Sequence, residues 1–141
     1  MDAVDQSASA LAWARERAPD IRFRQADIFA VDLPHERYDL VYDSGCLHHL
    51  APHRRTSYLA PGGHFGRVCF AAGTGDGNSG TEVPDAQLYR DGSLHGGLAY
   101  TADELRHLFQ DCTEVELRPM RADTELYGMP FLLTGLFRKE P

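Results

Sequence analysis

The chain has 141 residues, 43% hydrophobic and 25% charged, which is the composition of an ordinary folded domain. Its formal net charge of −7 leaves no basic face for a phosphate backbone, so nucleic acid is not expected as a partner. The only lysine is Lys139, so the amine that Schiff-base and P-loop chemistries need is missing from the body of the chain.

The first half of the chain alternates between helical and extended patterns. Apolar residues at near-helical spacing predict a helix over residues 7–18, which Pro19 ends. Short apolar runs then predict strands over residues 21–25, 38–43 and 65–70. Residues 54–59 leave room for one short helix between the last two strands. This order is typical of a doubly wound α/β sheet.

The second half begins with a loop and ends with two strands. Glycines over residues 73–80 predict a flexible loop, and little periodicity follows up to residue 98. A capping box at Thr101 and Glu104 opens a helix over residues 102–110. Alternation predicts a strand over residues 113–118, and an apolar run predicts a closing strand over residues 131–137. No run reaches the ~20 apolar residues that span a bilayer, so a membrane partner is not expected.

The run from Tyr38 to Leu50 carries the densest set of candidate site residues. It begins as a buried strand and breaks at Ser44-Gly45, where glycine permits a tight turn. In open parallel sheets, ligands bind beyond the carboxyl ends of the strands. Polar residues follow at that position: Asp43, Ser44, Gly45, Cys46, His48 and His49.

This run resembles the segment after the fourth strand of class I S-adenosylmethionine (SAM) dependent methyltransferases. Residues 4–7, Val-Asp-Gln-Ser, look like the end of that family's second strand, and residues 25–28, Gln-Ala-Asp-Ile, like the end of its third. Residues 59–65, which contain Pro-Gly-Gly, are similar to its turn into the fifth strand. The resemblance implies a Rossmann-like, mostly parallel sheet with an antiparallel C-terminal strand pair.

The resemblance also implies a cofactor, SAM, and roles for individual residues. Asp5, with Gln6 beside it, corresponds to the position that takes the ribose hydroxyls. Asp27 corresponds to the contact with the adenine amino group, and Ile28 to the apolar neighbour of the ring. The remaining cofactor-binding positions are Asp43, Ser44 and Gly45.

The chain departs from the family at its beginning. The family's first strand and Gly-rich loop should precede Asp5, and only four residues stand there. We therefore expect a single domain over residues 1–141, truncated at its N-terminus. The strands ending at Asp5 and Asp43 would lose an inner neighbour, which predicts poor SAM affinity and possible self-association.

His48 and His49 are the candidate catalytic residues, because imidazole titrates near neutrality and can act as a base or orient a substrate. Replacing either is expected to alter the pH profile of turnover near neutrality. Cys46 is expected to be a small buried residue rather than a nucleophile. Together with His53 these residues suggest a metal site, but the glutamate of a zinc-protease motif is absent, and no metal is expected.

Methyl transfer to a small-molecule acceptor is the function that we expect. Two alternatives are a catalytically silent remnant that serves as a binding or interaction module and a nucleotide- or nicotinamide-binding Rossmann-like domain. Three cysteines without paired spacing indicate reduced thiols and a cytoplasmic setting.

Candidate walls of a substrate pocket are Tyr89, Leu94, Tyr100, Tyr127, Met129 and Phe131.

Overall fold

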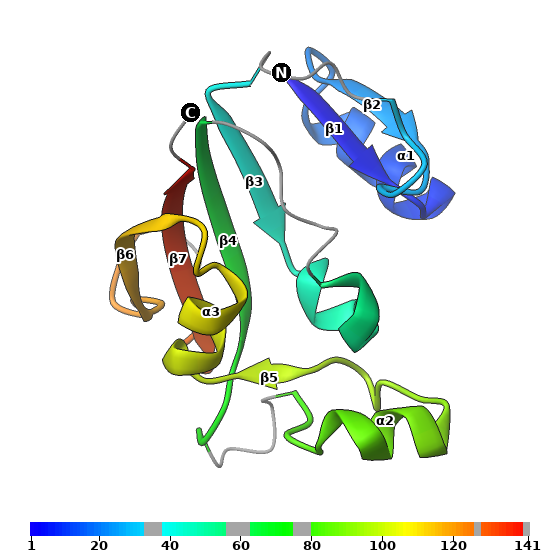
Figure 1. Ribbon diagram of the computed structural model, residues 1–141. Coiled ribbons are helices and arrows are strands. Elements are labelled where there is room, and N and C mark those ends of the chain that lie inside the picture. The colour runs from blue at the N-terminus through cyan, green and yellow to red at the C-terminus, as the bar shows by residue number, and fades with distance from the viewer. Residues whose placement is uncertain (33–37, 56–62, 75–79, 126–127, 140–141) are drawn as a thin grey trace. The chain divides into compact units, whose positions relative to one another are not determined.

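The computed structural model describes residues 1–32, 38–55, 63–74, 80–125 and 128–139 (Figure 1). The expected Pro-Gly-Gly turn at residues 59–62, most of the short helix expected at 54–59, the loop at 75–79 and Tyr127 lie outside these residues. The chain divides into two compact units, Met1–Pro34 and His35–Pro141, which we describe separately. The expectation of a single domain stays a prediction.

The first unit is a strand, a helix and a parallel strand. Strand β1 (Asp2–Asp5) leads into helix α1 (Ala8–Arg17), and β2 (Arg22–Gln25) returns parallel to β1. The helix begins where the Ser7 hydroxyl accepts a hydrogen bond from the Ala10 amide. Leu11 is the buried residue of the helix, with 2% of its surface exposed.

The second unit is built on a mixed sheet whose strands lie in the order β3-β4-β7-β6 (Figure 1). Strand β3 (Leu40–Ser44) pairs in parallel with β4 (Gly63–Ala71), and β7 (Leu132–Lys139) runs antiparallel on the other side of β4. Strand β6 (Thr113–Pro119) is antiparallel to β7. The expected α/β sheet with an antiparallel C-terminal pair is therefore confirmed.

The core of the second unit lies between this sheet and helix α3 (Ala102–Leu108). The capping box expected at Thr101 and Glu104 is present and begins the helix. The Phe109 ring lies 5.6 Å from the Phe65 ring and 4.8 Å from the Phe137 ring, measured between centroids. All three rings are buried, so they link the end of α3 to β4 and β7.

Two elements were not expected from the sequence. Helix α2 (Asp85–Asp91) buries only Leu88, so it shows no apolar period, although Pro84 and Gly92 mark its two ends. Strand β5 (Ala99–Tyr100) is two residues long and pairs with the end of β4, which is too short for a pattern. Two short 3-10 helices, η1 (Leu47–His49) and η2 (Pro52–Arg54), follow β3.

No helix in the described ranges is both long and apolar enough to cross a membrane.

Replacing Phe109 with Ala should lower the free energy of unfolding by roughly 3 to 5 kcal/mol, because it removes the ring that both other phenylalanines contact. Urea unfolding followed by circular dichroism measures this change. Val115→Ala is the control, because Val115 is 52% exposed at an irregular point of β6. That variant should lose less than about 1 kcal/mol, and equal losses in the two variants would contradict this description of the core.

Candidate functional site

The first unit brings two of the expected cofactor-binding carboxylates to the same end of its parallel strand pair. Asp5 ends β1 opposite Gln25, and Asp27 follows two residues after Gln25. One Asp5 oxygen accepts a hydrogen bond from the Ser7 amide at 2.7 Å, and one Asp27 oxygen accepts from the Phe29 amide at 2.9 Å. Each carboxylate is thus held by a backbone donor two residues further along the chain.

The neighbours of these carboxylates differ in exposure. Gln6 is exposed, and its carbonyl oxygen accepts a hydrogen bond from the Gln25 side chain, which ties the two strand ends together. Ile28 is half-buried beside Asp27. An apolar side chain next to a fixed carboxylate suits a ligand that is both aromatic and polar.

The second unit places Asp43 at the end of β3, where it is 3% exposed. Its Oδ1 accepts a hydrogen bond from the Cys46 amide at 2.7 Å, and its Oδ2 accepts from the Leu47 amide at 3.1 Å. These two bonds fold the chain directly into η1. Asp43 is therefore a capping group for the turn, and its expected contact with a cofactor stays a prediction.

The turn that Asp43 closes requires glycine at position 45. Gly45 has φ +88°, a conformation that side chains disfavour, and a Cβ there would lie 3.1 Å from the His48 ring. Ser44, just before it, is exposed at the strand end. The absence of a side chain at Gly45 thus gives the His48 imidazole its place.

His48 is packed rather than free. Its ring stacks on Phe70 with centroids 4.3 Å apart. Gly97 lies so close to the ring that a Cβ on Gly97 would stand 3.0 Å from the His48 Cδ2 atom. The His48 carbonyl accepts the Leu98 amide at 2.8 Å, and its Nδ1 is buried without a hydrogen-bond partner among the described residues. His49 is exposed, with its ring 4.3 Å from that of His48.

Burial, with smaller contributions from His49 and Arg67, lowers the pKa of His48 to about 4. The ring is therefore neutral at pH 7, and any step that depends on its protonation occurs near pH 4. The low pKa of His48 does not favour a pH dependence of turnover near neutrality through this residue, and its catalytic role stays a prediction.

Sequence reasoning missed a pair of arginines beside Tyr100 in the second unit, one of them buried and the other half-buried. Arg67 stands on β4 with 1% of its surface exposed, and Arg55 follows η2. Both guanidinium carbons lie within 6 Å of the Tyr100 ring, at 5.4 Å for Arg55 and 5.8 Å for Arg67. An arginine in the middle of the apolar run of β4 is the signal that could have found this group.

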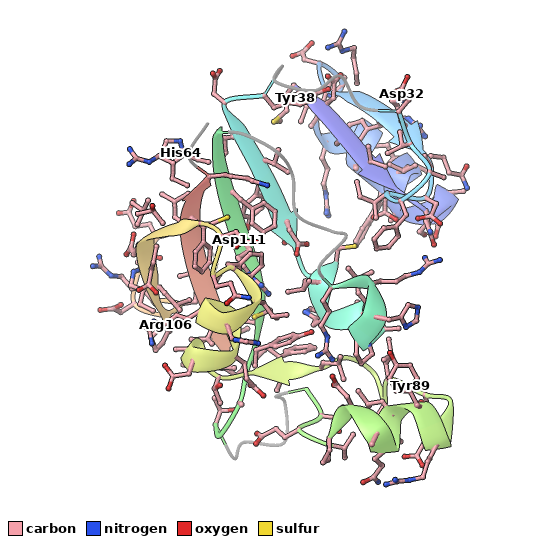
Figure 2. All side chains as sticks on the ribbon, viewed as in Figure 1. Asp32, Tyr38, His64, Tyr89, Arg106 and Asp111 are labelled. Carbon is pink, nitrogen blue, oxygen red and sulfur yellow. The ribbon has the colours of Figure 1, made fainter. Side chains whose placement is uncertain are left out.

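The other candidates are distributed as follows. Tyr100, expected as a pocket wall, lines a cavity of about 140 Å³. Tyr89, labelled on α2 in Figure 2, is exposed, and its hydroxyl lies 3.0 Å from the His53 Nδ1, with which it forms a hydrogen bond. Leu94, Met129 and Phe131 are half-buried and do not line this cavity. Cys46 is exposed, contrary to expectation, and Cys46, Cys69 and Cys112 form no disulfide. Within the described ranges, no group of three or more His, Cys, Asp or Glu could hold a metal ion.

Comparison with known proteins gives one family match in sequence and many in structure. Residues 1–63 match a family model described as a methyltransferase domain. No curated protein sequence matches the chain. In structure the chain is similar to the N-methyltransferase NodS from Bradyrhizobium japonicum WM9, solved with S-adenosyl-L-homocysteine (SAH), at a TM-score of 0.63 and 20% identity. The chain has the class I methyltransferase fold.

Two further solved methyltransferases are similar to this methyltransferase-fold chain. The 1,6-didemethyltoxoflavin-N1-methyltransferase of Burkholderia thailandensis, solved with bound 1,6-didemethyltoxoflavin and SAH, has a TM-score of 0.65 and 22% identity. A SAM-dependent methyltransferase from Mesorhizobium loti has a TM-score of 0.60 and 22% identity. The three comparisons cover 98% to 99% of this chain, and the chain spans 66%, 61% and 80% of the respective proteins. The alternative of a catalytically silent remnant gains no support from these findings.

Replacing His48 with Gln should flatten the pH dependence of stability in this methyltransferase-fold chain. The unfolded chain takes up the proton with a pKa near 6.5, while the folded chain resists it to about 4. The stability that neutral His48 contributes is therefore complete above pH 6.5 and is lost as the pH falls through about 4. The loss is at most roughly 3 kcal/mol.

Urea unfolding at pH 7, 6, 5 and 4 measures this dependence. His95→Gln serves as the matched control, because His95 is exposed and pairs with Asp91. Subtracting each variant from the wild type removes the contribution of the carboxylates, which also titrate in this range. Identical slopes in the wild type and the His48→Gln protein would show that His48 is not buried as a neutral ring.

Proposed function

We propose that this chain binds SAM and serves in the transfer of its methyl group to a small-molecule acceptor. The observation that carries the proposal is the pair of carboxylates, Asp5 and Asp27, held at the carboxyl ends of two adjacent parallel strands. The family match over residues 1–63 covers both positions, which supports the assignment.

The donor and acceptor chemistry of these positions fits the cofactor. Asp5 is exposed and uses one oxygen on the Ser7 amide, so its second oxygen can accept both hydroxyls of a ribose. Asp27 can accept the adenine amino group, and Ile28 can pack against the ring. Gln6 borders Asp5 in the first unit. In the second unit, Asp43, Ser44 and Gly45 at the end of β3 stay predicted cofactor-binding positions.

When bound, SAM supplies a methyl group that its sulfonium already activates. The chain therefore needs chiefly to position the acceptor and to receive its proton. His49, exposed beside the buried His48, is the group that we assign to proton transfer. His48, which is neutral and packed on Phe70, orients its neighbour.

Replacing Asp5 or Asp27 with Ala should weaken SAH binding by a charge-assisted hydrogen bond, roughly 1.5 to 3 kcal/mol, or about 10- to 100-fold in Kd. Isothermal titration calorimetry measures this directly. Asp20→Ala, an exposed carboxylate of the same unit, is the matched control and should keep full affinity.

Circular dichroism must confirm that each variant is folded, because both carboxylates also accept backbone amides. Unchanged SAH affinity in a folded Asp5→Ala protein would remove the cofactor assignment. Loss of affinity in the Asp20→Ala control would show a general effect of charge instead.

A further inference from the structure

The buried guanidinium of Arg67 has no carboxylate partner among the described residues of the second unit. Its Nε, Nη1 and Nη2 are all inaccessible to solvent, and the polar side chain that interacts with them there is the Cys69 thiol, which supplies no counterion because burial raises its pKa. The other contacts of Arg67 are aromatic: its guanidinium carbon lies 4.9 Å from the Phe109 ring and 5.8 Å from the Tyr100 ring. A cation removed from water without a counterion is strongly unfavourable, and buried charges in proteins are normally paired.

The nearest carboxylate in the sheet does not supply that pairing. Asp43 stands opposite Arg67 in the register of β3 and β4, but the structure places no ion pair between them in the described ranges. Both Asp43 oxygens accept backbone amides of the turn. Arg67 therefore keeps a positive charge for which the described residues provide no counterion.

Two other polar atoms in the same cluster lack a partner within the described part of the chain. The Tyr100 hydroxyl is buried without a hydrogen bond, and Tyr100 is only 3% exposed. Arg55 uses its two terminal nitrogens on Asp85, at 3.3 and 3.0 Å, but its Nε is buried and unpaired. Arginine nitrogens can only donate, and a tyrosine hydroxyl can donate as well, so the group missing from this cluster is an acceptor.

A cavity of about 140 Å³ is lined by Arg55 and Tyr100, whereas Arg67 contacts the Tyr100 ring without lining the cavity itself. Its acidic residues are already engaged: Glu82 accepts the Gly73 amide, Asp85 pairs with Arg55, and Glu104 caps α3. A cavity of ~150 Å³ can hold a benzene ring, whereas complete ligand pockets are typically ~300 to 1,000 Å³. The space thus suits one end of a small molecule.

We propose that Arg55 and Tyr100 bind a carboxylate in this cavity, with the Arg67 charge next to the Tyr100 ring favouring an anion, and that this carboxylate belongs to the methyl acceptor. A carboxylate has the planar pair of oxygens that a guanidinium binds most strongly, and it would neutralise Arg67. The second half of the proposal rests on the proposed methyl transfer. The acceptor is accordingly an acidic small molecule, anchored by its carboxylate.

The test is calorimetric titration of the chain with benzoate, and with benzamide and benzylamine as neutral and cationic compounds of similar shape. Benzoate should bind at least about 10-fold more tightly than benzamide, because only the carboxylate compensates the buried charge. Arg67→Met should lower benzoate affinity roughly 10- to 100-fold. The same variant should unfold at an equal or higher temperature, because it removes an uncompensated buried cation.

Two more variants complete the experiment. Arg106→Met is the matched control. Arg106, labelled in Figure 2, is an exposed arginine of α3 that pairs with Glu114, and its loss should leave benzoate binding unchanged. Tyr100→Phe removes one donor and keeps the ring, so it should weaken benzoate roughly 3- to 10-fold even if Arg67→Met does not fold.

Benzoate affinity no greater than that of benzamide, tighter binding of benzylamine, or full benzoate affinity in the variants would overturn the proposal. Titration with SAH on the same samples separates the two proposals. SAH binding without benzoate binding removes the carboxylate site alone. Benzoate binding without SAH binding overturns the assignment of the carboxylate to a methyl acceptor and removes the proposed methyl transfer.

Discussion

The second unit depends on the buried Asp43 carboxylate and the two backbone amides that it accepts. The first amides of a helix have no acceptor within the helix itself. At the start of η1, the Asp43 carboxylate accepts the amides of Cys46 and Leu47, and without it these two amides would lose that acceptor. The bonds turn the chain by fixing Gly45 in its left-handed conformation. That turn then carries His48 beneath Phe70 and leaves His49 at the surface.

Strand β4 connects this turn to the rest of the unit. It holds β3 on one edge and β7 on the other, and its last residues also hold β5. One face of β4 carries Phe65 toward the core, and on the same face Arg67 stands opposite Asp43. Because this face of β4 is buried, the Arg67 guanidinium does not reach water. Its burial distinguishes Arg67 from the other described arginines.

Much of the fold follows from local signals in the sequence. The helix starts at Ser7 and Thr101 depend on side chains that cap amides three residues away, so composition and spacing are sufficient to find them. The strand end at Asp43 follows from a short apolar run that stops at polar residues. The strand end at Asp5 was expected from the resemblance of residues 4–7 to the family's second strand, and the cofactor roles of both positions stay predictions.

The remaining features depend on contacts between distant parts of the chain. The burial of His48 requires Phe70 and Gly97, and its low pKa follows from that packing rather than from its neighbours in sequence. Helix α2 is held by Tyr89 against His53 and by Asp85 against Arg55, and its own sequence shows no apolar face. Such features follow from the three-dimensional contacts, so a period or a motif does not reveal them.

The division of the chain into two units also divides its chromophores. The single tryptophan, Trp13, lies in the first unit, where the Arg17 guanidinium stands 4.3 Å over its ring. All six tyrosines occur at position 38 or later, in the second unit. Indole fluorescence therefore reports on the first unit and tyrosine absorbance on the second, so a single denaturation can follow each unit separately.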